Sequence, residues 1–204
     1  MPTLGINLWE MKPRPFTKVA QKINRTVWPE CKDLKIFVIT IIMNSVAKGI
    51  QAELKQTKPF SSTGEEASIA ILRTADQLQQ QLVELLKPYG LSPTQFNALR
   101  ILRGAGEAGL PCSEIGVRMI NHDPDITRLL DRLEQRGLVE RQRDPKDRRI
   151  HVARVTKTGL DLLKGLDKPV AEFHLITTAE IGESNLKSLI RLLDKLRQSL
   201  HNSK

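Results

Sequence analysis

The sequence predicts a mainly α-helical protein with one small β-hairpin. Leu and Ile dominate the apolar residues, while one Tyr, two Trp and five Phe are the aromatic residues among 204. Leucines recur at helical spacing in several stretches between residues 65 and 200. The alternating "IHVARVT" follows a charged turn, "DPKDRR", which is the pattern of a β-hairpin. The length suits one domain, or one domain with an appendage.

The charge of the chain is unevenly distributed. The formal net charge is +9, and residues 1–58 hold ten Lys and Arg against four Asp and Glu. Residues 59–204 hold the other 22 basic residues against 19 acidic residues. A surface for nucleic acid in this second part therefore has to be local. We divide the chain into a basic N-terminal extension, residues 1–58, and a folded domain, residues 59–204.

The N-terminal extension has no sustained hydrophobic period. It leads into "IFVITIIM", residues 36–43, which is too short to cross a bilayer, because a spanning helix needs roughly 20 apolar residues. Its position and flanks do not fit a signal peptide, so we expect no membrane partner. Two interpretations stay open. The segment is β-prone and packs on the domain, or the residues before Met43 are disordered or do not belong to the native protein.

Residues 65–88 are expected to form the first long helix. Its apolar side chains recur at alternating steps of four and three, a narrow stripe that is typical of a packing seam. Pro88 and Gly90 end the pattern. A second helix is predicted after Ser92, an N-cap residue that is followed by a proline at the first helical position. A short third helix is predicted in "PCSEIGVRMI", with Ser113 as its cap.

The segment "HDPDITRLLDRLEQRG" predicts an amphipathic helix with a polar outer face. Asp123 is the expected N-cap, and Gly137 lies just past the predicted end. The polar side chains have donors and acceptors that could contact base edges and phosphates. The short helix, a tight connection and this helix match a helix-turn-helix, although any amphipathic surface helix has a polar face. The residues assigned to DNA contact on this helix are Asp125, Thr127, Arg128, Asp131 and Arg132.

The predicted hairpin follows this helix directly and has a charged tip. Residues 141–154 hold six basic residues against two acidic residues. An arginine at such a tip can enter the minor groove while the helix lies in the neighbouring major groove. Asp147 would repel phosphate, so we expect it to accept hydrogen bonds from Arg149 and to hold the tip in one shape. A merely soluble turn is the alternative. The DNA-contacting residues assigned to the hairpin are Arg143, Lys146, Arg148 and Arg149.

Residues 124–159, "PDITRLLDRLEQRGLVERQRDPKDRRIHVARVTKTG", resemble the recognition helix and wing of the multiple-antibiotic-resistance-regulator (MarR) family. The resemblance is specific at "TRLLDRLEQRGLV" and "DPKDRR" and extends more weakly from about residue 65 to 200. It implies a winged helix-turn-helix repressor that binds a palindromic operator as a dimer and is often released by small aromatic acids or oxidants. Thr127 and Arg128 match helix positions that face DNA in the family. Asp147 and Arg149 match its Asp-x-Arg wing motif.

In this resemblance residues 92–156 form the winged-helix DNA-binding region. Residues 65–88 and 157–201 form flanking dimerisation helices, and residues 1–58 have no counterpart. A helix is predicted after Thr156, and Pro169 should end or kink it. The last segment places leucines at steps of three and four, in a run that is short for a free coiled coil. We expect the two outer seams to interlock across a two-fold axis, with core packing inside one chain as the alternative. The residues assigned to dimerisation are Ile71, Leu78, Leu82, Leu186, Leu189, Leu193, Leu196 and Leu200.

The sequence says less about what the protein senses. Cys31 and Cys112 have neither disulfide nor metal-site spacing, and the four His residues are scattered, so we expect no cofactor and no metal. Cys112 precedes a predicted N-cap, where a helix dipole could lower its pKa, but a small buried thiol is the favoured interpretation. By exclusion, the resemblance leaves an uncharged cleft between the dimer helices and the winged helix as the expected site for a small aromatic effector.

The predicted function is sequence-specific binding of double-stranded DNA by a homodimeric transcriptional regulator. Such a protein would act in the bacterial cytoplasm, on the nucleoid through its bound DNA. The alternative is a winged helix used for protein contacts, which should have a neutral or apolar outer helix face. An enzyme is not expected, because the sequence has no Gly-rich phosphate loop, no catalytic carboxylate pair in a recognisable motif and no nucleophile with its base.

Overall fold

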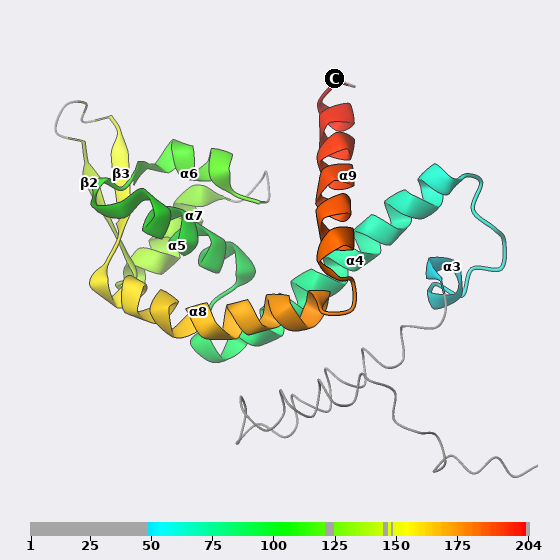
Figure 1. Ribbon diagram of the computed structural model, residues 1–204. Coiled ribbons are helices and arrows are strands. Elements are labelled where there is room, and N and C mark those ends of the chain that lie inside the picture. Colours follow the sequence, from blue (N-terminus) through cyan, green and yellow to red (C-terminus); the bar gives the residue numbers. More distant parts are fainter. Residues whose placement is uncertain (1–48, 121–124, 145–146, 148, 203–204) are drawn as a thin grey trace, which may run out of the picture. The chain divides into compact units, whose positions relative to one another are not determined.

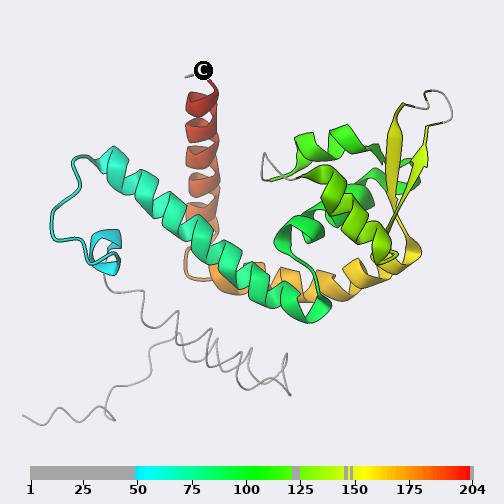
Figure 2. The same ribbon diagram turned by 180° about the vertical axis from the view of Figure 1, so that it is seen from behind.

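A computed structural model describes residues 49–120, 125–144, 147 and 149–202 of the chain (Figure 1; Figure 2 gives the view from behind). The chain divides into two compact units, Met1–Arg73 and Thr74–Lys204. The interpretations of residues 1–42 lie outside the described residues, as do the DNA contacts assigned to Lys146 and Arg148. The division of the chain at residue 58 stays a prediction.

The first long helix, α4, spans Thr63–Leu86 and confirms the helix predicted from the leucine spacing. A 3-10 turn, η1 (Lys87–Tyr89), follows it, and Gly90 ends the turn in the left-handed conformation with φ of 63°. Glycine adopts this conformation without steric cost, which explains why the helix stops there. A four-residue helix, α3 (Ile50–Glu53), lies in the N-terminal extension, whose sequence has no sustained hydrophobic period.

Helices α5 (Pro93–Ala105) and α6 (Cys112–Arg118) follow, separated by a second 3-10 turn, η2 (Gly106–Ala108). Ser92 caps α5 as predicted, and its hydroxyl accepts a hydrogen bond from the Gln95 amide. The cap predicted for α6 is wrong. This helix begins at Cys112, so Ser113 lies in its first turn and Pro111 stands at the N-cap position. Pro111 also belongs to a strand, and strand pairing fixes where the helix can begin.

Helix α7 spans Ile126–Gln135 and is the predicted amphipathic helix. Its N-cap is Asp125 rather than Asp123, because the Asp125 carboxylate accepts a hydrogen bond from the Arg128 amide at 3.1 Å. Both aspartates suit an N-cap by composition, and the sequence pattern alone did not separate them. Gly137, predicted just past the end, has a φ of 67°.

The strands form a three-stranded antiparallel sheet in the order β1-β3-β2. Strands β2 (Val139–Arg143) and β3 (His151–Val155) are the predicted hairpin, with Arg143 paired to His151. Strand β1 (Leu110–Pro111) pairs with the other edge of β3 and was not predicted, because two residues carry no period. Gly109 allows the close approach: a Cβ there would lie 2.5 Å from the Ala153 carbonyl oxygen.

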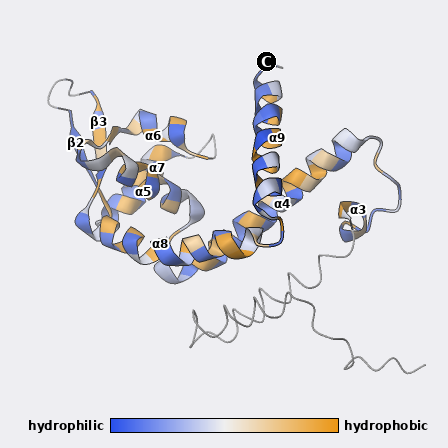
Figure 3. Cartoon of the chain, in the orientation of Figure 1, coloured by the Kyte–Doolittle hydropathy of each residue, from blue (hydrophilic) through white to orange (hydrophobic). Residues whose placement is uncertain are grey.

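Leucines from three helices are prominent in the core of the second unit, which also contains residues of α6 and of the strands. Full burial of each leucine contributes roughly 1.5–3 kcal/mol relative to exposure. Figure 3 shows how apolar and polar residues alternate along these helices. The arrangement confirms a mainly helical α+β protein with a winged helix-turn-helix. The leucines with no exposed surface in α5, α7 and the following helix, α8 (Lys157–Thr178), are Leu99, Leu102, Leu130, Leu133, Leu163 and Leu166.

Helix α8 begins after Thr156, whose hydroxyl accepts a hydrogen bond from the Gly159 amide as an N-cap. Pro169 was predicted to end or kink this helix. It does not end it, because α8 continues through it to Thr178, and a kink at Pro169 stays a prediction. A proline inside a helix costs about 3 kcal/mol. Leu166 before the proline and Val170 after it both pack against the core, and this packing opposes that cost.

The last helix, α9, spans Glu183–Asn202. It contains no buried residue within the described chain, although leucines make up much of its sequence. Helix α4 has one buried residue, Leu86, at its C-terminal end. Both outer helices therefore form as predicted, and most of their apolar side chains keep exposed surface.

Candidate nucleic-acid interface

The outer face of α7 presents polar side chains to solvent. Thr127, Arg128 and Arg132 are exposed, and the Arg128 side chain keeps 79% of its surface. The Arg128 Nε lies 3.2 Å from the Asp125 carboxylate, one turn earlier. Because Leu129 and Leu133 on the inner face are buried, the helix is held with this polar face outward. The exposed guanidinium groups have the donors that phosphates and guanine edges accept.

The two acidic residues assigned to DNA contact on α7 have basic partners within the chain. Asp125 caps α7 and pairs with Arg128. Asp131 pairs with Arg141, whose Nη2 lies 2.5 Å from its carboxylate. A carboxylate repels phosphate, so these contacts favour structural roles for both aspartates over contacts with DNA. Of the other residues assigned on α7, Arg128 is the partner of Asp125 and still keeps 79% of its side-chain surface, while Thr127 and Arg132 have no competing partner among the described contacts.

The tip of the wing has the internal hydrogen bond that the sequence predicted. The Asp147 carboxylate accepts hydrogen bonds from the Arg149 amide at 3.0 Å and from its Nε at 3.4 Å. The Asp147 amide in turn donates to the Asp144 carboxylate at 3.2 Å. Backbone bonds from Ile150 to Asp147 and from Asp144 to Ile150 close the turn, each at 2.9 Å. The Arg149 side chain is 94% exposed and Arg143 is exposed, so both can reach a ligand.

A cluster that the sequence did not reveal joins the middle of β2 to α7. The Glu134 carboxylate accepts three hydrogen bonds from Arg141: from its amide at 3.0 Å, from Nε at 3.0 Å and from Nη2 at 2.5 Å. The same Nη2 contacts Asp131. Asp131 and Glu134 lie one turn apart on α7, so one guanidinium spans both. No spacing rule links these helix residues to a strand residue, and the signal available was an arginine near the start of the predicted hairpin.

The charges in this cluster reinforce one another. The hydrogen bonds from Arg141 hold the pKa of Glu134 below its ordinary value of 4.5. The hydrogen bond to Glu134 raises the pKa of Arg141 above its ordinary value. Both groups are therefore charged at neutral pH, and the Arg141 side chain keeps 22% of its surface.

Cys112 does not have the surroundings of a reactive thiol. Burial raises its pKa above the ordinary value of 9.0, and the nearby Arg141 lowers it by a smaller amount. The favoured interpretation was a small buried thiol; Cys112 is a free thiol that is only half-buried and packs against the core. Within the described ranges no cluster of His, Cys, Asp and Glu could hold a metal ion. No helix in the described part of the chain is long and apolar enough to cross a membrane.

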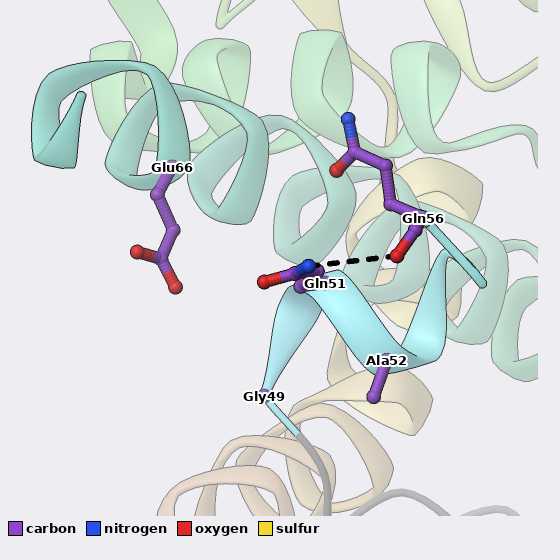
Figure 4. Close-up of a pocket in the computed structure, with 5 residues that line it drawn as sticks. All are labelled: Gly49, Gln51, Ala52, Gln56 and Glu66. Atoms are coloured by element: carbon purple, nitrogen blue, oxygen red, sulfur yellow. Dashed lines mark hydrogen bonds between the residues drawn. The ribbon is translucent and has the colours of Figure 1, made fainter. Parts of the chain in front are cut away.

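A pocket of about 360 Å³ lies in the first unit (Figure 4). Its lining residues come from α3, the segment after it and the start of α4, and include Gln51, Gln56 and Glu66. The Gln51 side-chain amide donates to the Gln56 carbonyl oxygen at 3.5 Å across one wall. The pocket is polar and open, and it is not the uncharged cleft that was expected for an aromatic effector.

The residues assigned to dimerisation keep exposed surface in the single chain. On α4, Ile71 is 37% exposed and Leu78 is 43% exposed, while Leu82 packs partly against the core. On α9, exposure ranges from half-buried Leu193 to Leu200, which is 63% exposed. Leu186 is half-buried like Leu193, while Leu189 is 42% exposed and Leu196 is 40% exposed.

The chain is similar to known transcriptional regulators. The MarR family model matches residues 91–151, which include α5, α6, α7 and β2. The regulator MhqR of Bacillus subtilis is 31% identical over 98 residues, which are 48% of this chain and 66% of MhqR. A mutant MarR from Escherichia coli, solved in complex with operator DNA, is 26% identical with a TM-score of 0.57. That match covers 62% of this chain and 90% of that one.

A MarR transcription factor from Planctomyces limnophilus, known from its crystal structure, is more similar in sequence. It is 38% identical with a TM-score of 0.52, and the match covers 67% of this chain and 98% of that one. Because this match spans nearly a whole family member, the chain belongs to the MarR family, whose members are transcriptional regulators rather than enzymes.

Proposed function

We propose that this protein binds double-stranded DNA and represses transcription. The observation that carries the proposal is the pairing of an exposed arginine face on α7 with a wing whose tip is internally hydrogen-bonded. The helix would lie in a major groove and Arg149 would reach the adjacent minor groove. The DNA complex of the E. coli relative supports this assignment. Thr127, Arg128 and Arg132 are the proposed contacts from the helix, with Arg143, Lys146, Arg148 and Arg149 from the wing.

We further propose a homodimer on a palindromic operator. One helix and one wing give few contacts, and two half-sites separated by a helical turn of DNA double them. The apolar faces of α4 and α9 keep exposed surface in the single chain, which supports a partner chain there. A small aromatic effector that releases the operator, and action in the bacterial cytoplasm, belong to the same proposal and rest on family resemblance.

A winged helix that contacts proteins instead of DNA is the competing function. It should have a neutral or apolar outer face on α7, whereas Arg128 and Arg132 are exposed there. This difference favours DNA.

The salt dependence of binding tests the proposal. Purified protein would be used to select duplexes from a random pool, and the affinity for a selected duplex would be measured by fluorescence anisotropy at several salt concentrations. Because arginines displace counterions from phosphates, log K should fall linearly with log[salt], by about 0.9 per phosphate contacted. A scrambled duplex of the same composition is the control and should bind more weakly at every salt concentration. Failure to enrich any duplex, or an affinity that is insensitive to salt, would contradict DNA binding.

A further inference from the structure

We infer that Arg141 is a positioning residue that fixes the angle between the wing and the recognition helix, and that this angle contributes to operator choice. The inference rests on the proposed DNA-binding function. Its structural basis is the cluster that Arg141 forms with Asp131 and Glu134, two residues of α7. The cluster joins the two elements that are proposed to enter neighbouring grooves.

The position of Arg141 in the sheet makes this contact available. Strand β2 lies at an edge, because the strand order is β1-β3-β2. On its outer side, an edge strand has backbone amides that do not donate hydrogen bonds to a neighbouring strand. The Arg141 amide donates to Glu134 at 3.0 Å, so the helix carboxylate replaces the missing strand partner. Backbone and side chain of one residue are thus both fixed to α7.

The geometry requires an arginine. The planar guanidinium places Nε and Nη2 on Glu134 while Nη2 also contacts Asp131. A lysine ammonium is a single point charge and cannot reproduce a fork across two carboxylates. Arg141 therefore fixes the orientation of β2 relative to α7 and also neutralises the carboxylates of Asp131 and Glu134.

The burial of Arg141 separates it from the proposed DNA contacts. Its side chain keeps 22% of its surface, against 94% for Arg149 at the tip. It is the middle residue of β2 and is paired with the fully buried Ala153, so it lies away from the tip of the wing. A guanidinium already bound to two carboxylates has few donors left for phosphate. Its effect on DNA would act through the orientation of the wing.

Glu134→Gln is a test in which a positioning role and a simple charge effect predict opposite changes in affinity for the selected duplex. The substitution removes a negative charge, so electrostatics alone would tighten binding to any DNA. If the cluster positions the wing, affinity for the selected duplex should instead fall by roughly threefold to tenfold, while affinity for the scrambled duplex is unchanged or higher. Glu140→Gln is the matched control, because it makes the same charge change at an exposed residue of β2. It should not weaken binding to the selected duplex.

Arg141→Lys provides a second variant that conserves the charge. It should weaken binding to the selected duplex and leave the salt dependence on the scrambled duplex unchanged, as expected of a residue that does not contact phosphate. Equal weakening on both duplexes, or tighter binding to the selected duplex by Glu134→Gln, would overturn the inference.

A measurement without DNA separates this inference from the proposed function. Hydrogen exchange followed by mass spectrometry should show faster exchange of β2 amides in Glu134→Gln than in Glu140→Gln, with similar exchange in α5. Unchanged exchange in β2 would contradict the link between wing and helix, whatever the DNA results. Conversely, a wild-type protein that enriches no duplex while the β2 amides exchange faster in Glu134→Gln would contradict the DNA function and leave the link in place.

Discussion

Asp147 shows how a single residue can oppose binding by its charge and favour it by its hydrogen bonds. Its carboxylate lies on a surface proposed to meet phosphate, where a negative charge is unfavourable. It accepts hydrogen bonds from the Arg149 amide and side chain, and its own amide donates to Asp144. These hydrogen bonds restrict Asp147 and Arg149 before any ligand binds, which reduces the entropy lost on binding.

Asp147→Ala should therefore bind a selected duplex several-fold more weakly, although its charge becomes more favourable. Ordering one backbone residue costs about 1–2 kcal/mol, and a long side chain costs a comparable amount. A single screened charge near DNA contributes on the order of 1 kcal/mol, so the loss of order should dominate. The measurement is anisotropy at physiological salt.

Asp147→Asn is the matched control, because it removes the same charge but keeps an oxygen that can accept from the Arg149 amide. It should bind at least as tightly as the wild type. If the alanine and asparagine variants bind equally well, and both more tightly than the wild type, the hydrogen bonds of Asp147 do not order the tip.

At the scale of elements, periodicity in the sequence predicted the long helices and the hairpin. The stripes of α4, α7 and α8 recur over two turns or more, so one misplaced residue does not hide them. Strand β1 has two residues and depends on pairing with β3, which local sequence does not encode. The course of α8 through Pro169 likewise depends on packing at Leu166 and Val170, contacts that are distant in sequence.

In the candidate site too, contacts between residues close in sequence could be predicted, and contacts between different elements could not. The contact between Asp147 and Arg149 spans two residues, and the sequence predicted it. The cluster of Arg141 joins a strand to a helix, and it was not predicted. The sequence also identified Asp125 and Asp131 as polar residues of the outer face, but which partner each carboxylate takes depends on the fold.

The contact between α8 and the turn after α7 depends on Gly159. A Cβ at this position would lie 2.4 Å from the Leu138 carbonyl oxygen and 2.7 Å from a Val155 methyl carbon. Gly159→Ala should therefore destabilise the fold, by about 1–3 kcal/mol as for other overpacked sites. Urea unfolding followed by circular dichroism measures this change.

Gly165 in the same helix gives the control, since a Cβ there would meet nothing within 4 Å. Gly165→Ala should stabilise the protein by up to about 1 kcal/mol, because alanine has a higher helix propensity than glycine at an exposed helix position. Equal changes in the free energy of unfolding for the two variants would show that α8 does not approach the sheet this closely.

At the scale of the whole molecule, the described chain leaves apolar surface that its own core does not cover. Helix α9 has no buried residue. Its leucines lie on one face and keep exposed surface, 42% for Leu189 and 40% for Leu196. Packing within one chain and packing between two chains are the alternatives for this face. They differ in what a charge on the seam does: the first predicts loss of folding, and the second predicts loss of assembly.

Leu193→Glu should convert a dimer to a monomer while the winged helix stays folded. Leu193 lies at the centre of the α9 seam, and burying an unpaired carboxylate in an apolar interface is strongly unfavourable. Gln198→Glu adds the same charge on the other side of α9, where the residue is exposed, and should leave assembly unchanged.

Sedimentation velocity over a range of concentrations measures assembly, and thermal unfolding measures the fold. The monomer should bind a single half-site as the wild type does. It should lose the additional affinity for a palindrome, because the two winged helices of the dimer are no longer joined. A Leu193→Glu variant that unfolds at every concentration would assign the seam to the core of one chain, and one that remains dimeric would place the interface elsewhere.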